Sequence, residues 1–305
     1  MAVLLTGGTG FVGSALIDHL MERSQEVTIT SRSAQRARAK LSKPDLSVIE
    51  WKDPVGSPLE LPPGAQFDAV VNLMGESIAE GRWTENQKKR IRESRTLGTR
   101  RLVDAVIQSQ SLPKVMVSAS AIGIYGDSGE EIVEESHQHG TGFLTEVCED
   151  WEVEANRLAD HGVRVVNLRI GIVLGKNGGA MEKMVPMFRW CLGGKLGSGK
   201  QWMAWIHLDD LVAMIGWAIE NESIVGPLNA TAPNPVRNIE LTKTLASAVG
   251  RPAILPAPKF GLKLVLGEFA DSLFFSQRVV PAAALASGFQ FKFADVESAI
   301  SEIVN

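Results

Sequence analysis

The stretch Val3-Leu4-Leu5-Thr6-Gly7-Gly8-Thr9-Gly10-Phe11-Val12-Gly13, close to the start of the 305-residue chain, decides the fold. A short apolar run leads into three glycines spaced three residues apart. An amphipathic segment follows, and its apolar face carries Leu16, Leu20 and Met21. This order predicts a strand, a tight turn and a helix.

The three glycines each have a physical role in such a turn. Gly7 permits a sharp turn off the strand, Gly10 lets the phosphates of a ligand approach the backbone, and Gly13 lets the helix pack close to the strand. The free N–H groups of the first helical turn and the helix dipole then favour an anion. We therefore expect a dinucleotide pyrophosphate here, and the alternative is a glycine-rich turn without a ligand. The expected contacts are Gly7, Thr9, Gly10, Phe11, Val12 and Gly13.

Composition excludes several classes of protein. With 45% hydrophobic residues the chain can bury a sizeable core, and its net charge of −4 gives no general attraction for nucleic acid or anionic membranes. Cys148 and Cys191 are far apart in sequence, and no CxxC motif or histidine cluster is present, which argues against disulfide scaffolds and metal sites.

Targeting signals are also not evident in the sequence. No basic region precedes Leu4, glycines interrupt the apolar run at once, and no uncharged apolar run reaches membrane-spanning length. We expect a cytoplasmic protein with a small-molecule substrate and no nucleic-acid or membrane partner. The sequence leaves a homodimer open.

Strand and helix patterns alternate through the first half of the chain. Helices are expected at Ala34–Leu41 and 84–109, and strands at 26–32, 47–51, 68–73, 114–118 and 163–169. Such alternation predicts an α/β fold with a parallel sheet covered on both faces. Ligands of these sheets bind beyond the carboxyl ends of the strands.

The alternation ends near Gly175. Apolar helices are expected at 181–192 and Leu208–Glu220, with an apolar run at 202–206 between them. Three prolines mark 251–258 as a linker into the last piece of the chain. The methionines of the first of these helices recur at helical spacing and are expected in the core.

With these pieces in order, the chain resembles the extended short-chain dehydrogenase/reductase superfamily. More closely, it resembles an atypical epimerase branch, similar to the NAD-dependent epimerase/dehydratase family, that ends in a small domain of unknown function. The resemblance covers essentially the whole chain and rests on TGGTGFVG (6–13), NLMGE (72–76), ESRTLGT (93–99), SASAIGIYGD (118–127), LRIGIVLG (168–175), GSGKQWMAWIHLDDL (197–211) and RPAILPAP (251–258).

The resemblance implies a Rossmann-type doubly wound sheet with a smaller C-terminal substrate lobe. The expected NADP-binding domain covers residues 1–175, and 206–232 return to it. Residues 176–205 and 233–305 are expected to form the substrate lobe and the C-terminal domain.

The end of the second strand favours NADP(H) over NAD. Enzymes that prefer NAD usually place a carboxylate there to accept from the ribose 2′-hydroxyl. Here the strand ends in Ser31-Arg32-Ser33, with Arg36 one helical turn further on, and a guanidinium forks well onto a 2′-phosphate. The alternative is that Arg32 is a solvated charge at a strand end.

Other cofactor positions follow from the resemblance alone. Leu73, Met74 and Gly75 are implied to pass beside the adenine and ribose, and Val173 lies in the matching LRIGIVLG motif. Arg95, where relatives often carry asparagine, is implied to face the cofactor. The alternative for Arg95 is one more charge on an exposed helix.

The superfamily's catalytic Tyr-x-x-x-Lys pair is missing. Aligned by Trp151-Glu152, its tyrosine position falls at Leu144 (or Phe143) and its lysine position at Cys148, which we expect to be a buried apolar residue. The remaining hydroxyls are Tyr125, expected as proton donor, and Ser120, expected to position the substrate oxygen beyond the fifth strand. The alternative is that Tyr125 packs on the loop 127–129.

Two functions follow from these observations. The first is an NADP(H)-dependent oxidoreductase or epimerase that acts on a small, sugar-like metabolite. The second is an NADP(H)-binding sensor or interaction protein without turnover, for which the resemblance suggests a link to cell division.

His207, Asp209 and Asp210 resemble a segment that anchors the substrate lobe, and we expect the two acids to cap the next helix.

Overall fold

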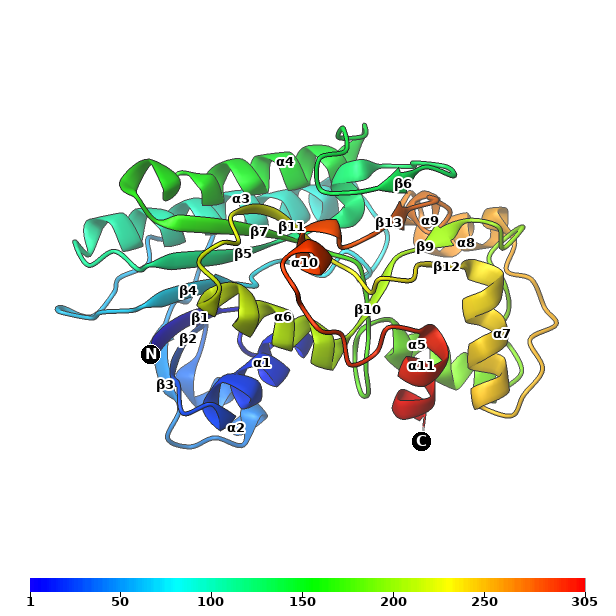
Figure 1. The fold of residues 1–305 in the computed structure, drawn as a ribbon, viewed down its shortest axis with the longest axis horizontal. Helices are drawn as coiled ribbons and strands as arrows, with labels where there is room; N and C mark the ends of the chain where they lie inside the picture. The colour runs from blue at the N-terminus through cyan, green and yellow to red at the C-terminus, as the bar shows by residue number, and fades with distance from the viewer. Residues whose placement is uncertain (305) are drawn as a thin grey trace.

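The computed structural model describes residues 1–304, which are built around a seven-stranded parallel sheet (Figure 1). The strand order is β11-β7-β5-β4-β1-β2-β3, so the direction of winding reverses between β1 and β4. In chain order the strands are β1 (Ala2–Thr6), β2 (Glu26–Ser31), β3 (Ser47–Glu50), β4 (Ala69–Asn72), β5 (Val115–Ala121), β7 (Arg164–Ile170) and β11 (Gly226–Ala230). This is the Rossmann-type α/β fold that the sequence predicts, with its ligand crevice expected at the reversal.

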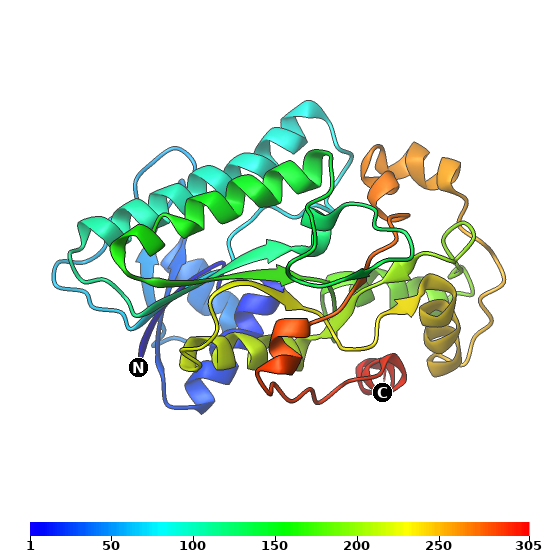
Figure 2. The same ribbon diagram turned by 45° about the horizontal axis from the view of Figure 1, so that its top comes forward.

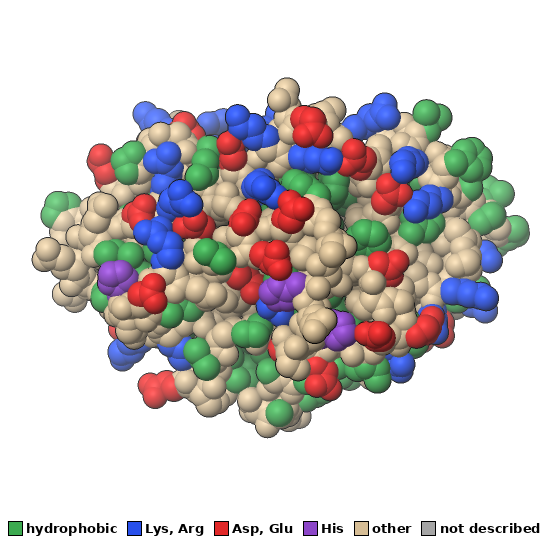
Figure 3. Space-filling model, turned by 90° about the horizontal axis from the view of Figure 1, so that it is seen from above, with side chains coloured by type: hydrophobic (Ala, Val, Ile, Leu, Met, Phe, Trp, Pro, Cys, Tyr) green, Lys and Arg blue, Asp and Glu red, His purple; other side chains and the backbone are tan. Residues whose placement is uncertain are grey.

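Helices cover both faces of the sheet (Figure 1). One face carries α1 (Phe11–Glu22), α2 (Ala34–Leu41) and α6 (Leu208–Glu220), and the other carries α3 (Glu85–Gln108) and α4 (Phe143–Asn156). Both α2 and α6 have the predicted bounds. Basic and acidic side chains alternate over α3 and α4 (Figure 3), where Arg92 pairs with Glu146 at 2.6 Å.

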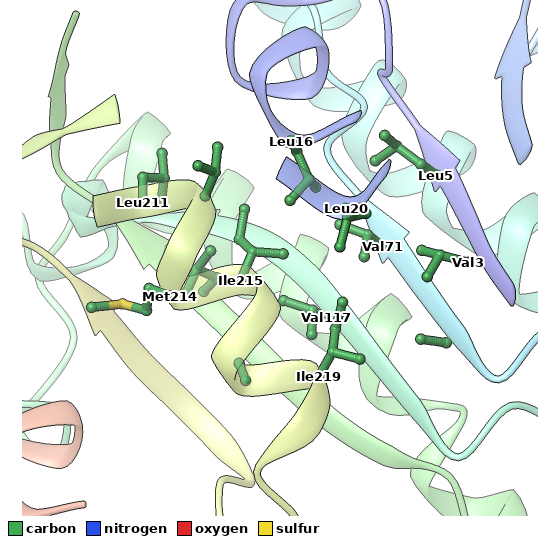
Figure 4. Close-up of a cluster of buried hydrophobic side chains, with 14 of the residues drawn as sticks. Val3, Leu5, Leu16, Leu20, Val71, Val117, Leu211, Met214, Ile215 and Ile219 are labelled. Carbon is green, nitrogen blue, oxygen red and sulfur yellow. The ribbon is translucent and has the colours of Figure 1, made fainter. Parts of the chain in front are cut away.

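The core between α1, α6 and the sheet is built from aliphatic side chains (Figure 4). Leu16 and Leu20 of α1 point towards the sheet and α6, as their spacing predicts. Met21 does not share this face and is 44% exposed, because it lies one helical position beyond Leu20 and turns away from the sheet. The helix α1 therefore starts at the glycine turn and is fixed along its length by α6.

The remaining elements form a second lobe beyond the carboxyl ends of β5 and β7 (Figure 2). They begin with the short 3-10 helix η1 (Ile122–Tyr125) and the strand β6 (Ile132–Val133), whereas the 3-10 helix η2 (Ala159–His161) connects α4 to the amino end of β7 and is not part of this lobe. The others are β8 (Ile172–Leu174), α5 (Gly179–Arg189), β9 (Trp202–Met203), β10 (Trp205–His207), β12 (Val236–Arg237), α7 (Asn238–Ala248), α8 (Lys259–Leu266), α9 (Phe269–Ser272), β13 (Arg278–Val279) and α11 (Val296–Val304). The helix α10 (Ala282–Ala286) lies between β13 and α11 in the chain but packs beside β11.

Three details differ from the sequence expectations. The strand β5 continues to Ala121, so Ser120 lies within the strand and not beyond it. The predicted helix 181–192 ends at Arg189. Residues around α10, expected in the second lobe, instead add Ala284 and Phe289 to the core beside β11. Small alternating residues such as those of β5 carry little strand signal, which explains the first difference.

Within residues 1–304, no helix is long and apolar enough to cross a membrane. The same residues contain no group of three or more His, Cys, Asp or Glu side chains placed to hold a metal ion. Cys148 is a buried free thiol and Cys191 an exposed one.

Candidate functional site

The turn between β1 and α1 leaves no room for side chains at two of its glycines. Gly7 has a φ of +72°, and a Cβ there would lie 2.5 Å from the carbonyl oxygen of Leu73. A Cβ on Gly13 would overlap the carbonyl oxygen of Gly7. At Gly10 a Cβ would sit 3.2 Å from that same oxygen, which is tight but not excluded. The backbone of the turn is therefore bare and closely packed on β4, as the glycine spacing predicts.

The N-terminus of α1 has features that suit an anion. Gly10 is the N-cap and supplies no side-chain oxygen, and the first turn contains no acidic residue. The first N–H groups of a helix have no intrahelical acceptor, and the helix dipole favours negative charge beside them. The bare turn and the uncapped helix together fit a dinucleotide pyrophosphate.

Phe11 and Val173 connect this turn to the second lobe. A Cβ on Gly175 or Gly179 would lie 2.9 Å from the Phe11 ring, so the loop before α5 closes directly on that ring. Val173 lies in β8, pairs with Ile206 and packs against the main core, as Val12 does. The side chains of Phe11 and Val12 are thus engaged in packing, and their expected contacts with the cofactor would use backbone atoms.

At the end of β2, Arg32 is exposed and has no ion pair with any residue in 1–304. Ser33 caps α2 by accepting from the Arg36 backbone N–H at 3.4 Å. Ser31 donates its hydroxyl to the Ser33 carbonyl at 3.3 Å. The Arg32 guanidinium therefore has all of its donors available for an anionic ligand.

One carboxylate beside this arginine is not apparent from the sequence. Glu50 ends β3 directly opposite Ser31, and it accepts from the Ala34 backbone N–H at 2.9 Å. The carboxylate thus occupies the N-terminus of α2. The register of β2 on β3 brings Glu50 here, and a sequence without strand pairing does not show it.

The loop after β4 lies against the glycine turn on one side and α3 on the other. Leu73 contacts Gly7, and Met74 contacts Gly98 of α3. Gly75 packs on the Arg95 guanidinium, where a Cβ would lie 2.9 Å from the arginine Cζ. The three residues expected beside the cofactor therefore follow the carboxyl end of β4, next to the β1–α1 turn.

Arg95 is not one more solvated charge on α3. Its Nη1 donates to the carbonyl oxygens of Glu76 at 2.9 Å and Ile91 at 3.1 Å. Its Cζ lies 5.1 Å from the centre of the Trp151 ring on α4. Burial lowers the pKa of Arg95 from its ordinary value. The guanidinium is held between the Gly75 turn and the Trp151 ring.

The α4 positions of the missing catalytic pair are apolar or inert. Leu144 packs on Gly123, and Cys148 is buried, which raises the pKa of its thiol to about 11. Thr145 is buried and donates its hydroxyl to the Gly123 carbonyl at 3.2 Å. It lies where α4 meets η1, a contact that the helical pattern does not reveal.

Ser120 and Tyr125 belong to one buried hydrogen-bond network. Ser120 donates to the Glu152 carboxylate at 2.7 Å, and Arg169 donates to both oxygens of that carboxylate at 2.9 Å. Arg169 also donates to the Tyr125 hydroxyl at 2.9 Å, and Tyr125 donates to Asn229 at 2.7 Å. Burial is the main cause that raises the pKa of Tyr125.

The network gives both hydroxyls hydrogen-bonding roles in the structure that the sequence does not reveal. Tyr125 is 2% exposed, and its hydroxyl is engaged with Arg169 and Asn229. Arg169 comes from β7 and Glu152 from α4, so strand and helix are linked behind the end of β5. The catalytic roles of Ser120 and Tyr125 stay predictions.

The segment after β10 differs from the expected pair of capping acids. His207 itself is the N-cap of α6 and accepts from the Asp209 backbone N–H at 3.1 Å. Asp210 accepts from the backbone N–H groups of Lys292 at 2.7 Å and Phe293 at 2.9 Å. It therefore holds the C-terminal segment on α6, a long-range role that the helix-start pattern does not show.

Comparison with known proteins agrees with this architecture. The family model described as "NAD dependent epimerase/dehydratase family" matches residues 3–229, and a "Domain of unknown function" model matches 257–303. The chain is 41% identical to the chloroplastic epimerase family protein SDR39U1 homolog of Arabidopsis thaliana, over 100% of this chain and 87% of the relative. It is 38% identical to epimerase family protein YfhF of Bacillus subtilis, over 100% and 98%.

A solved structure is similar over the same length. The crystal structure of human epimerase family protein SDR39U1 (isoform 2) with NADPH superposes with a TM-score of 0.89 at 35% identity. The match covers 100% of this chain and 99% of the human chain. UDP-glucose 4-epimerase of Thermus thermophilus, at 20% identity, shares the fold with a TM-score of 0.77.

Proposed function

Because this chain belongs to the NAD-dependent epimerase/dehydratase family, we propose that it binds NADP(H) at the β1–α1 turn and uses it as an oxidoreductase or epimerase. The substrate would be a small, sugar-like metabolite. One observation carries this proposal. The N-terminus of α1 has no capping side chain, and it follows glycines at which an added Cβ would collide with the backbone. Bare backbone of this kind suits a pyrophosphate.

The residues of the turn and those at the neighbouring strand ends would each bind a different part of the cofactor. The first N–H groups of α1 would hold the pyrophosphate, and Arg32 with Ser31 would hold the 2′-phosphate. Residues 73–75 and Val173 would line the rest of the groove. The human relative crystallised with NADPH supports the choice of the phosphorylated dinucleotide.

Bound NADP(H) would supply or accept a hydride, and the protein would have to move the accompanying proton. Tyr125 is the proposed donor, and Ser120 is proposed to position the substrate oxygen. For Tyr125 to act, its hydroxyl would have to exchange Asn229 for the substrate, because that hydrogen bond now uses its proton. The nearby Arg169 would keep the hydroxyl oriented throughout this exchange.

A second candidate function is an NADP(H)-binding sensor or interaction protein without turnover. The specific observation in its favour is that Leu144 and Cys148 stand at the positions of the superfamily's proton-transfer pair. Neither side chain can exchange a proton near neutral pH, since burial raises the pKa of the Cys148 thiol to about 11. Such a protein would still hold the dinucleotide.

Turnover measurements separate the two candidates. Purified protein would be mixed with NADPH and a panel of aldehydes and ketones, and separately with NADP⁺ and a panel of nucleotide sugars. Loss of NADPH with one carbonyl class supports the oxidoreductase, and interconversion of a nucleotide sugar in the presence of NADP⁺, without net formation of NADPH, supports the epimerase. Tight NADPH binding with neither activity across the panel would favour the sensor.

A further inference from the structure

Arg95 is a partly buried cation without a partner of opposite charge. No carboxylate in residues 1–304 lies within ion-pairing distance of its guanidinium, although other arginines of α3 are paired, such as Arg92 with Glu146 and Arg100 with Glu154. Burying a charge is unfavourable unless it is paired. The two backbone carbonyls that accept from Nη1 offset only part of this cost.

Two nitrogens of the Arg95 guanidinium donate no hydrogen bond within residues 1–304. Its only hydrogen bonds within the described part of the chain leave from Nη1, to Glu76 and Ile91. Nε and Nη2 have no acceptor, yet they are not among the fully enclosed unpaired atoms, so solvent reaches them. A guanidinium with two free nitrogens matches the geometry of a carboxylate or phosphate.

Two neighbouring residues hold the guanidinium that carries these donors. Gly75, at the carboxyl end of β4, packs on the guanidinium, and the Trp151 ring of α4 stacks on it. Trp151 lies one helical turn after Cys148, whose Sγ would be 4.0 Å from a Cβ on Gly123, just after β5. The cation therefore lies at the carboxyl ends of β4 and β5, where substrates of such sheets bind.

We propose that Arg95 binds the carboxylate or phosphate group of the substrate, which makes the substrate an oxyanion-bearing small metabolite. This inference rests on the proposed function, because it places the anion in the same crevice as the dinucleotide. The free Nε and Nη2 groups would donate to two oxygens of the anion. The Trp151 ring and the Gly75 backbone would hold the planar guanidinium in one orientation while it does so.

Anion binding can be measured without knowing the substrate. Thermal unfolding of the full chain would be followed in sodium malonate, in inorganic phosphate and in sodium chloride of equal ionic strength. The wild-type protein is expected to gain more from malonate or phosphate than from chloride, because a ligand that binds the folded state raises its stability. Both anions also stabilise folded proteins in general by exclusion from the protein surface. Arg95→Gln should therefore keep this general gain and lose the additional gain seen in the wild type, and Arg95→Lys should weaken anion binding about tenfold, since lysine lacks the fork.

Two controls define the outcomes. Arg92→Gln removes a neighbouring α3 arginine that is already paired, and it should keep the anion effect. Equal stabilisation of wild type and Arg95→Gln by malonate and phosphate would overturn the proposal. Because each variant is compared with itself in chloride, a change in its baseline stability does not affect the result.

NADPH titration of the same proteins separates this proposal from the proposed function. The resemblance implies that Arg95 faces the cofactor, whereas the present proposal assigns it to the substrate, so NADPH affinity should be the same within about twofold for wild type and Arg95→Gln. A tenfold loss in Arg95→Gln would mean that Arg95 holds a phosphate of the dinucleotide, and the substrate assignment would be wrong. If wild-type protein bound malonate but no NADPH, the proposed function would be wrong, whereas the proposal of an anion site at Arg95 would still be supported.

Discussion

The carbonyl oxygen of Gly7 occupies the place where a side chain on Gly13 would begin. The end of β1 and the first turn of α1 are consequently in direct backbone contact. Gly10, between them, leaves its outer side free. The turn thus combines Gly13, which the packing requires, with Gly10, whose open side suits the proposed dinucleotide.

Substitutions at these two glycines should have different effects. Gly13→Ala is expected to destabilise the protein by about 1–3 kcal/mol, because the new carbon overlaps backbone that cannot move cheaply. Gly10→Val should cost less than about 1 kcal/mol in stability, yet abolish NADPH binding by filling the pyrophosphate position. Chemical denaturation and NADPH titration measure the two effects. Equal protection of wild type and Gly10→Val by NADPH against thermal unfolding would place the site elsewhere.

Arg32 should discriminate between the two dinucleotides. Arg32→Ala is expected to remove a charge-assisted contact of about 1.5–3 kcal/mol for NADPH, while the weaker affinity for NADH stays unchanged. Lys40→Ala, which removes an exposed charge from the same helical region, is the matched control. Calorimetric titrations of both variants that show the same NADPH affinity would remove Arg32 from the site.

Tyr125→Phe tests the proposed proton donor. Turnover should fall at least about a hundredfold, the lower range for loss of a general acid. NADPH affinity should stay nearly unchanged. Asn229→Ala is the control, since it breaks the hydrogen bond of the hydroxyl without removing the hydroxyl itself. Full activity of Tyr125→Phe, or equal losses in both variants, would show that Tyr125 serves the structure and not the reaction.

The Arg169–Glu152 pair should contribute to folding. Arg169→Met leaves the buried Glu152 carboxylate without its cation, and a broken buried pair costs about 3–5 kcal/mol. The urea midpoint should fall accordingly. Arg157→Met breaks a more exposed pair with Asp104 and should cost less than about 1 kcal/mol. Similar urea midpoints for the two variants would contradict the importance given to the network.

The two cysteines should differ in reactivity. Burial raises the pKa of the Cys148 thiol to about 11, so it stays protonated at pH 8, whereas Cys191 is exposed. Iodoacetamide at pH 8 should therefore add one group to the native protein and two after unfolding, as seen by mass spectrometry. Because the folded state favours the neutral thiol, Cys148 should lower stability as the pH rises from about 9 towards 11. Rapid double labelling of native protein would argue against this burial.

Local signals predicted the elements that local chemistry controls. The bounds of α2 follow from Ser33 as its cap, and the glycine turn follows from spacing alone. Residues that act through long-range contacts were missed. Glu50 reaches the end of β2 through strand pairing, and Arg169 meets Glu152 across a strand and a helix.

Long-range contacts also explain why the candidate site could be predicted only in part from the sequence. The loss of the tyrosine and lysine on α4 is visible in the sequence, because it needs only an alignment of one helix. Whether Tyr125 is free is decided by Asn229, more than a hundred residues away. A pattern within one segment carries no information about such a partner.

The most direct test of the central claim is calorimetric titration of the unmodified protein with NADPH and with NADH under the same conditions. The exposed, unpaired Arg32 predicts at least tenfold tighter binding of NADPH, since the two dinucleotides differ only in the 2′-phosphate. Equal affinities, or tighter binding of NADH through the neighbouring Glu50 carboxylate, would contradict the account.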